Sequence, residues 1–146
     1  MNTQEIMQII TGGIGSVGFA ILFNVRGKKM IAATLGGFLS WAAFLTLRLA
    51  IPSEPVCYFL VSALISFYSE FMARRLKTPT TTFLMTSLIP LIPGGSLYYT
   101  MVYAFSGISE KFLSRGIYTL QLASALALGI ITVSAISNTL SKAKTM

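Results

Sequence analysis

The chain has 146 residues, of which 54% are hydrophobic and 10% are charged, and its mean hydropathy is +0.75. Soluble domains carry about 25% charged residues, so this composition excludes an ordinary water-soluble domain and indicates an integral membrane protein. The net charge of +7 would suit a nucleic-acid-binding protein, but the basic residues fall in short clusters between apolar runs. Because these clusters form no continuous basic face, membrane topology explains the charge better, and we predict no nucleic-acid partner.

Five apolar runs predict one domain, 1–146, built as an all-α bundle of about five transmembrane helices in contact with membrane lipid. A helix needs about 20 apolar residues to cross the hydrocarbon core, and each run is close to that length or longer. The predicted spans cover residues 6–23, 30–51, 56–73, 80–105 and 117–140. No positively charged region precedes the first run, so we expect that run to stay as a span rather than to be cleaved as a signal peptide.

The first two spans carry small residues at every fourth position, which would form a stripe along one face of each helix. Small residues let two helix backbones approach closely, so we expect the stripes to pack the first two helices together rather than to contact a ligand. The stripes consist of Gly12, Ser16 and Ala20 in the first span and Ala32, Gly36 and Ser40 in the second.

The fourth span is interrupted by the motif Pro90-Leu91-Ile92-Pro93-Gly94-Gly95. Proline removes a backbone donor and glycine adds conformational freedom, so a regular helix is unfavourable here. Irregular backbone survives at membrane depth only where protein buries it or where it lines a wet cavity. Transporters use such broken helices to turn amides and carbonyls toward a solute near the bilayer midplane, which makes the motif the first candidate for a solute site. A proline kink that only shapes packing is an equally good interpretation.

The residues after the two glycines would form the second half of the broken span. If Gly95 and Ser96 begin that half-helix, its first amides and the positive end of its dipole point at the break and suit an anionic group. Tyr99 follows and shares a helical face with Tyr103. Tyrosines at this position ordinarily anchor a helix at the membrane interface, and contact with the solute is the alternative.

Two ionisable residues inside the apolar runs are candidates for the substrate pathway. Glu70 is followed one turn later by Arg74, so an ion pair at the helix end is the simplest interpretation. The alternative is a proton carrier or a partner for a cationic group of the solute. Arg48 precedes the turn at Pro52, where its guanidinium can extend to the membrane surface. Alternatively, it binds a solute carboxylate at the outer end of the pathway.

The side-chain inventory limits the chemistry that the chain can perform. It has no histidine and no aspartate, and its only cysteine, Cys57, lies in an apolar run. A catalytic triad with histidine and a cluster of histidine or cysteine ligands are therefore excluded. We expect neither an enzyme nor a bound metal or other cofactor.

The distribution of basic residues predicts how the bundle is oriented. If all five runs cross, one side carries eight of the eleven lysines and arginines, and an excess of basic residues marks the cytoplasmic side. These eight are Arg26, Lys28, Lys29, Arg74, Arg75, Lys77, Lys142 and Lys144. The amino terminus and the loop 106–115 would then face outward and the carboxyl terminus would be cytoplasmic. A re-entrant fourth run gives the same imbalance, and we prefer five crossings because that run is long enough to cross.

Four segments form a pattern that is shared with a known family. They are Gly18-Phe19-Ala20-Ile21-Leu22-Phe23-Asn24-Val25, then Gly36-Gly37 with Trp41, then Lys77-Thr78-Pro79, and finally Pro90-Leu91-Ile92-Pro93-Gly94 with Tyr98. Together they resemble the threonine/serine exporter family, and specifically its smaller five-span membrane unit. The resemblance extends over about residues 15–129, and the Pro-Leu-Ile-Pro-Gly segment is its most specific element.

The resemblance implies secondary export of a small-molecule solute across the inner membrane of a bacterium, with threonine and serine or the dicarboxylate succinate as the solute. Long members of the family join two five-span halves, whereas split members encode a larger and a smaller protein, and one such pair is described as a succinate exporter. Because the chain is similar to the smaller half, the resemblance implies a larger homologous subunit or a homo-oligomer as partner. A structural subunit that does not transport and a passive oligomeric channel are the alternatives.

Overall fold

The computed structural model describes residues 3–143, and it describes their side chains as far as residue 139. Lys144 therefore lies outside the described residues, as does the side chain of Lys142. The helices are α1 (Thr3–Leu22), α2 (Lys28–Ala50), α3 (Glu54–Leu76), α4 (Thr80–Leu88), α5 (Gly94–Phe105) and α6 (Ser109–Ala143). A short 3₁₀ turn, η1 (Ile89–Leu91), follows α4. The described part of the chain contains no strand, so the predicted all-α fold class is confirmed.

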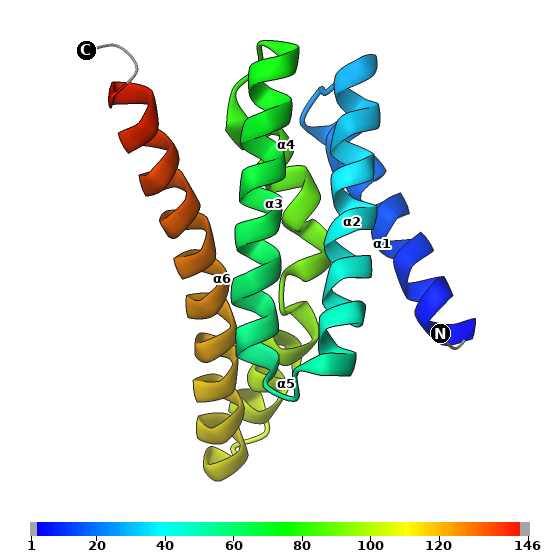
Figure 1. The fold of residues 1–146 in the computed structure, drawn as a ribbon. Helices are drawn as coiled ribbons and strands as arrows, with labels where there is room; N and C mark the ends of the chain where they lie inside the picture. Colours follow the sequence, from blue (N-terminus) through cyan, green and yellow to red (C-terminus); the bar gives the residue numbers. More distant parts are fainter. Residues whose placement is uncertain (1–2, 144–146) are drawn as a thin grey trace.

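Four of the described helices, α1, α2, α3 and α6, are each long and apolar enough to cross a membrane. The segments Thr80–Leu91 and Gly94–Phe105 pass the same test only as a pair, and they are bent by 60°. The described residues thus provide four spans, or five if the bent pair counts as one, and the predicted break in the fourth run is confirmed. Figure 1 shows α4 toward one end of the bundle and α5 toward the other, so the two halves follow one another along it.

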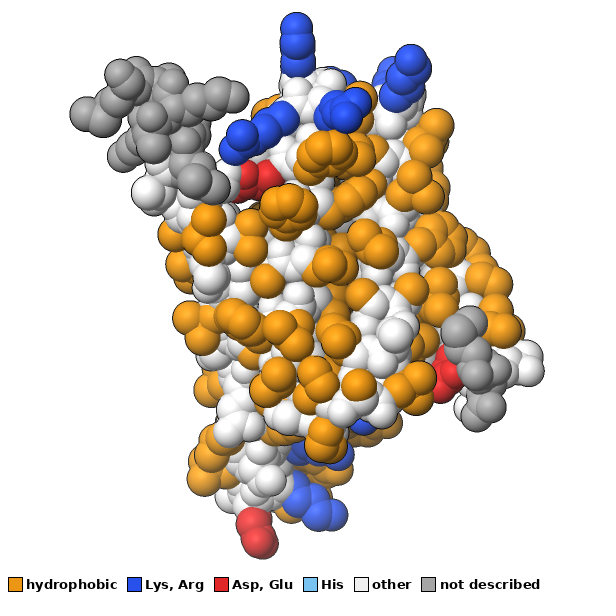
Figure 2. All heavy atoms as spheres, in the orientation of Figure 1, with side chains coloured by type: hydrophobic (Ala, Val, Ile, Leu, Met, Phe, Trp, Pro, Cys, Tyr) orange, Lys and Arg blue, Asp and Glu red, His pale blue; other side chains and the backbone are white. Residues whose placement is uncertain are grey.

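The turns after α1 and α3 bring most of the described basic residues to one end of the bundle. The first turn passes through Asn24 and Gly27 and the second through Lys77, and all three have a positive φ, between 48° and 63°. Positive φ lets the chain reverse within a few residues, and glycine and asparagine adopt it most easily. Figure 2 shows lysine and arginine side chains at this end and hydrophobic side chains over the belt between the two ends.

α3 lies at the centre of the bundle, where it contacts α2, α4 and α6 (Figure 1). One cluster of buried side chains joins α3 to α2, α4, η1 and α6, and it consists of Phe44, Cys57, Tyr58, Val61, Ile65, Leu88, Leu91 and Leu122. A second cluster, nearer the basic end, consists of Ala20, Val25, Ala32, Ala33, Ala73 and Phe83. α1 packs against α2, on the side away from α6 (Figure 1).

Small residues occur where α2 approaches its neighbours most closely. A Cβ atom on Gly37 would collide with Ser16 of α1, whereas a Cβ atom on Gly36 would collide with Ser87 of α4. The stripe predicted on α2 therefore approaches α4 at Gly36, and the adjacent Gly37 makes the close approach to α1. Of the residues in the two predicted stripes, those buried are Ser16, Ala20, Ala32, Gly36 and Ser40, and Gly12 is partly buried.

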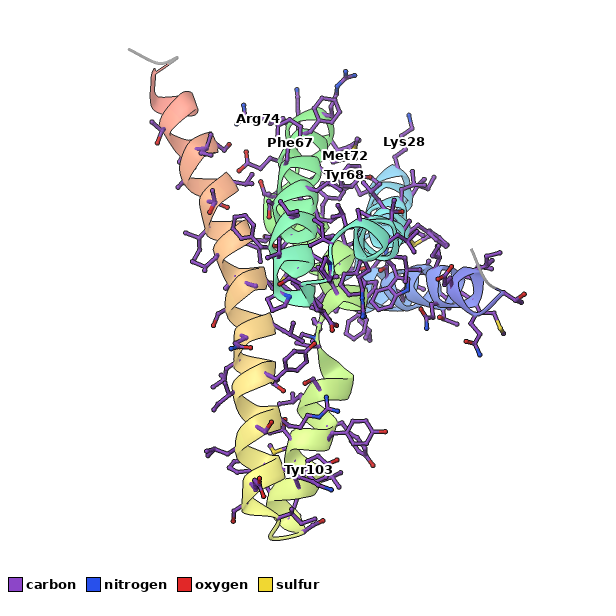
Figure 3. All side chains as sticks on the ribbon, turned by 60° about the horizontal axis from the view of Figure 1, so that its bottom comes forward. Lys28, Phe67, Tyr68, Met72, Arg74 and Tyr103 are labelled. Carbon is purple, nitrogen blue, oxygen red and sulfur yellow. The ribbon has the colours of Figure 1, made fainter. Side chains whose placement is uncertain are left out.

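α6 begins earlier than the fifth span that the sequence predicts. Gly107, with φ 69°, makes the turn after α5, and the helix starts at Ser109 rather than near residue 117. The prediction of a loop over residues 106–115 is therefore wrong for residues 109–115, which carry charged side chains but form the first turns of α6. With 35 residues α6 is about 52 Å long, so it exceeds the hydrocarbon thickness of about 30 Å. Its first turns and α5 form a hairpin that extends away from the other helices, with Tyr103 near the tip (Figure 3).

The contact between α3 and α6 leaves no room for a side chain at Gly129. A Cβ atom there would lie 2.5 Å from the carbonyl oxygen of Phe59 and 3.0 Å from the amide nitrogen of Ala63. Because both are backbone atoms of α3, the two helices must separate, and we expect Gly129→Ala to destabilise the protein by about 1–3 kcal/mol. Thermal unfolding of the purified protein in detergent measures the effect as a lower Tm.

Gly18→Ala is the matched control, because nothing lies within 4 Å of a Cβ atom built at that position. Alanine also has a higher helix propensity than glycine, so Gly18→Ala should leave the Tm unchanged or raise it slightly. Equal Tm values for the Gly129 and Gly18 variants would contradict the close contact.

Candidate functional site

The break between α4 and α5 interrupts the helix over two residues. η1 keeps the chain helical as far as Leu91, and Ile92 is extended, with φ −61° and ψ 127°. α5 then begins at Gly94, one residue earlier than the sequence suggested, and Pro93 before it offers no side-chain cap. The first amides of a helix have no partner within it, so the start of α5 presents backbone donors and a positive dipole end at the break.

A cavity of about 370 Å³ lies at this break. Its lining includes every residue of the Pro-Gly motif except Leu91, together with Ser96 and Tyr99 of α5. Other helices contribute Trp41 from α2, Glu54 and Tyr58 from α3, and Arg115, Tyr118 and Leu122 from α6. The break therefore lies where four helices meet, and the volume is in the range that small-molecule sites occupy.

The cavity extends from the middle of the bundle toward the end opposite the main basic cluster. Pro90 and Trp41, at one end of the cavity, lie close to α1, since a Cβ atom built on Gly12 would lie 3.2 Å from Pro90 and 3.7 Å from Trp41. Trp41 lies just past the midpoint of α2, whereas Glu54 is the first residue of α3 and marks the other end of the cavity. The indole Nε1 of Trp41, a residue of the cavity lining, is buried and has no hydrogen-bond partner among the described residues.

Glu54 is the centre of a polar cluster at the outer part of the cavity. One oxygen of its carboxylate accepts a hydrogen bond from the hydroxyl of Tyr118, and the other lies 3.7 Å from Nη1 of Arg48. The side chain of Glu54 is 26% exposed and that of Arg48 is 50% exposed. Arg48 also lies over the ring of Phe44, 5.8 Å from its centroid. The cluster thus connects α3 to both α2 and α6.

Sequence reasoning identified Arg48 as a candidate but missed Glu54 and Tyr118. In the sequence, Glu54 falls between the predicted spans 30–51 and 56–73, where a carboxylate ordinarily faces water. Only the packing of α6 against α3 brings Tyr118 to it. The one local feature that could have drawn attention to Glu54 is its closeness in sequence to Arg48, at the end of the preceding span.

Ser96 belongs to a hydroxyl cluster that fixes α5 against α6. Its Oγ lies 2.7 Å from Oγ1 of Thr119, which lies 3.1 Å from Oγ1 of Thr100. Thr119 also bonds to the backbone carbonyl of Arg115, and Thr100 to that of Ser96. Since these hydroxyls satisfy one another and the backbone, the start of α5 is held in place below the cavity.

Glu70 lies away from the cavity at the break. Near the other end of α3, its carboxylate accepts a hydrogen bond from Ser137 of α6 and lies 3.5 Å from Nη2 of Arg74. These side chains and the rings of Phe67 and Phe71 line a separate, mainly apolar cavity of about 320 Å³ between α3 and α6. Arg74 lies on the side of α3 that faces α6 (Figure 3). The structure therefore brings Arg48 to Glu54, which lines the cavity at the break, whereas Glu70 lies at the separate cavity between α3 and α6.

A model of the family described as "Threonine/Serine exporter, ThrE" matches residues 8–136. The chain belongs to this family. The match confirms the resemblance seen in the sequence, and it includes the break, Glu54 and Tyr118. Membership in the threonine/serine exporters, with the apolar helices, makes the chain a multi-pass membrane protein with an exporter-type transport role. No curated protein and no solved structure gave a significant match.

If the cavity at the break holds water, a cysteine in its wall should react with a charged thiol reagent. We expect Ser96→Cys, in a Cys57→Ala background, to be labelled rapidly by a membrane-impermeant methanethiosulfonate. Leu120→Cys is the control, because Leu120 is 67% exposed on the surface of α6 and follows Thr119, the residue that bonds to Ser96. Lipid around a cysteine at position 120 keeps its thiol protonated, and the protonated thiol reacts slowly. Equally slow labelling of both cysteines would show that the cavity is dry.

Proposed function

We propose that the chain is a membrane subunit of a secondary exporter of small amino acids, and that the cavity at the break between α4 and α5 is part of its solute pathway. The observation that carries the proposal is a cavity of about 370 Å³ at the non-helical segment of a chain that belongs to an exporter family. Broken helices that line a cavity are the recurring form of a solute site in transporters. The backbone at the start of α5 would add its contacts to those of the polar side chains in the lining.

The motif residues have separate roles in this proposal. Pro90 and Pro93 keep the chain from forming a regular helix, and Gly94 and Gly95 leave the backbone uncovered at the start of α5. Ser96 and Tyr99 add hydroxyl groups at the cavity wall. Threonine or serine is the proposed solute, and succinate is the alternative within the same family.

We further propose that the bent pair crosses the inner membrane of a bacterium, with the amino terminus outside and the carboxyl terminus in the cytoplasm. Two observations support this topology. The turns after α1 and α3 carry the larger basic cluster, which suits the cytoplasmic side (Figure 2). The bend of 60° also leaves α4 and α5 running from one end of the bundle toward the other rather than back to the same end.

The proposed complex contains a larger homologous subunit or further copies of this chain. Support comes from the resemblance to the smaller half of the family and from the α5–α6 hairpin, which extends past the other helices (Figure 3). The hairpin exposes large apolar side chains that a second membrane subunit can cover, namely Leu97, Met101, Phe105, Phe112 and Leu113.

The test of the proposed function is efflux of labelled threonine, serine and succinate from cells that express this chain, a larger-subunit homologue, or both. Saturable efflux that requires this chain, together with counterflow, is the expected result. Normal flux from the larger subunit alone would instead make this chain a structural subunit. Flux without saturation or counterflow would identify a passive channel.

Within the exporter, we expect Pro93→Ala to reduce transport more than Glu70→Gln does. Alanine restores the missing N–H and lets α4 continue toward α5, which closes the cavity, whereas Glu70 lies in the separate cavity near Arg74. The two variants should be compared at matched abundance in the membrane. A difference of about tenfold in their initial efflux rates corresponds to about 1.4 kcal/mol of transition-state free energy. Equal or reversed losses would contradict a pathway through the break.

A further inference from the structure

We propose that Glu54 selects the substrate by binding its ammonium group, so that the cavity accepts a zwitterionic amino acid and disfavours a dicarboxylate. This inference rests on the proposed function and adds a residue that determines specificity. Glu54 lines the cavity at the break, and it is the single carboxylate among the lining residues. No other described acidic side chain lines the cavity at the break, and Glu70 lies in the separate cavity between α3 and α6.

The geometry around Glu54 leaves part of its carboxylate available. Tyr118 donates to one oxygen, while the other oxygen is 3.7 Å from the half-exposed guanidinium of Arg48. A separation of 3.7 Å is longer than a charge-assisted hydrogen bond, which spans about 2.7–2.9 Å. An ammonium group in the cavity can therefore approach this oxygen more closely than Arg48 does. When it does so, the half-exposed side chain of Arg48 can turn toward water.

The charges in the cavity match the two ends of an amino acid. Glu54 supplies a negative group, while Arg115 and the uncapped start of α5 supply positive ones. A free amino acid carries its carboxylate and its ammonium on one carbon atom, so one cavity can satisfy both. A dicarboxylate would place a second negative charge against Glu54 or leave Glu54 without a solute partner, and either outcome costs affinity.

Tyr118 is a positioning residue in this scheme. Its hydroxyl comes from α6 and fixes the orientation of the Glu54 carboxylate at the start of α3. A carboxylate near the end of a helix otherwise samples several rotamers, which lowers its affinity for a directed donor. The hydroxyl cluster around Thr119, one residue further along, fixes this part of α6 against α5.

The competing explanation is that Glu54 is purely structural and connects α2, α3 and α6. The two explanations differ in what neutralising Glu54 does to discrimination between solutes. If the role is structural, Glu54→Gln lowers the affinity for all solutes by a similar factor. If Glu54 binds the ammonium group, the variant loses affinity only for solutes that have one.

The test compares threonine with 3-hydroxybutyrate, which has the same carbon chain, carboxylate and hydroxyl but lacks the amino group. Both are used as competitors of labelled threonine exchange in proteoliposomes that contain the complete transporter. We expect the wild-type protein to prefer threonine and Glu54→Gln to reduce that preference by about tenfold to a hundredfold, the range of a hydrogen bond between charged groups. Succinate should gain relative to threonine in the same variant.

Two further variants complete the design. Glu110→Gln also removes one carboxylate, but Glu110 is exposed near the start of α6 and does not line the cavity, so the preference should stay at the wild-type value. Tyr118→Phe keeps the charge of Glu54 and should reduce the preference less than Glu54→Gln does. An unchanged preference in Glu54→Gln would overturn the proposal, even if transport itself is slower.

Equilibrium binding of labelled threonine to the purified protein, with the same two competitors, separates this proposal from the proposed function. Threonine binding that Glu54→Gln weakens selectively, in a protein that does not transport, would support the role of Glu54 and contradict the exporter. Saturable transport with an unaltered preference in Glu54→Gln would support the exporter and overturn the role of Glu54. Absence of both transport and binding in the wild-type protein would overturn both.

Discussion

The rest of the structure depends on one constraint, which is that lipid offers no hydrogen bonds to backbone amides and carbonyls. α1, α2, α3 and α6 meet the constraint by continuous helical bonding across the apolar belt (Figure 2). The segment from Ile92 to Pro93 does not, because two prolines and two glycines interrupt the helix. The freed backbone groups need a polar or wet surrounding, and they line a cavity whose wall also includes Trp41, Glu54 and Tyr118.

Close packing elsewhere compensates for this interruption. α2 approaches α1 at Gly37 and α4 at Gly36, and α6 approaches α3 at Gly129. Association of helices in a membrane relies on van der Waals contact, since lipid is as apolar as the side chains themselves. Contacts of this kind join α2 to α1 and α4 and join α6 to α3, so these five helices pack closely without a continuous fourth span.

The sequence was most predictive where the cause of a feature is local. Apolar runs gave the all-α membrane class, and Pro90, Pro93 and the glycines gave the place of the break. Features that arise from contacts between distant segments were missed. Gly36 faces α4 because of how α2 and α4 cross, and Glu54 meets Tyr118, 64 positions away, only after α6 docks on α3. The charged start of α6 is predicted as a loop. Lys111 and Arg115 give the same sequence pattern in a loop as in a helix that extends beyond the membrane.

The polar contacts of α6 join it to both α5 and α3. Ser96, Thr100 and Thr119 join α5 to the first half of α6 through bonds that no charged solute group needs to replace. At this end α6 is joined to α3 by the hydrogen bond from Tyr118 to Glu54, the group that the proposed solute engages, and by the packing of Leu122 in the core cluster. In the proposed scheme a solute ammonium group takes the place of Arg48 of α2 at Glu54, while Tyr118 of α6 stays bound to the other carboxylate oxygen. The exchange thus breaks a contact between α2 and α3 and leaves intact the contacts that hold α6 to α3, including the close approach at Gly129.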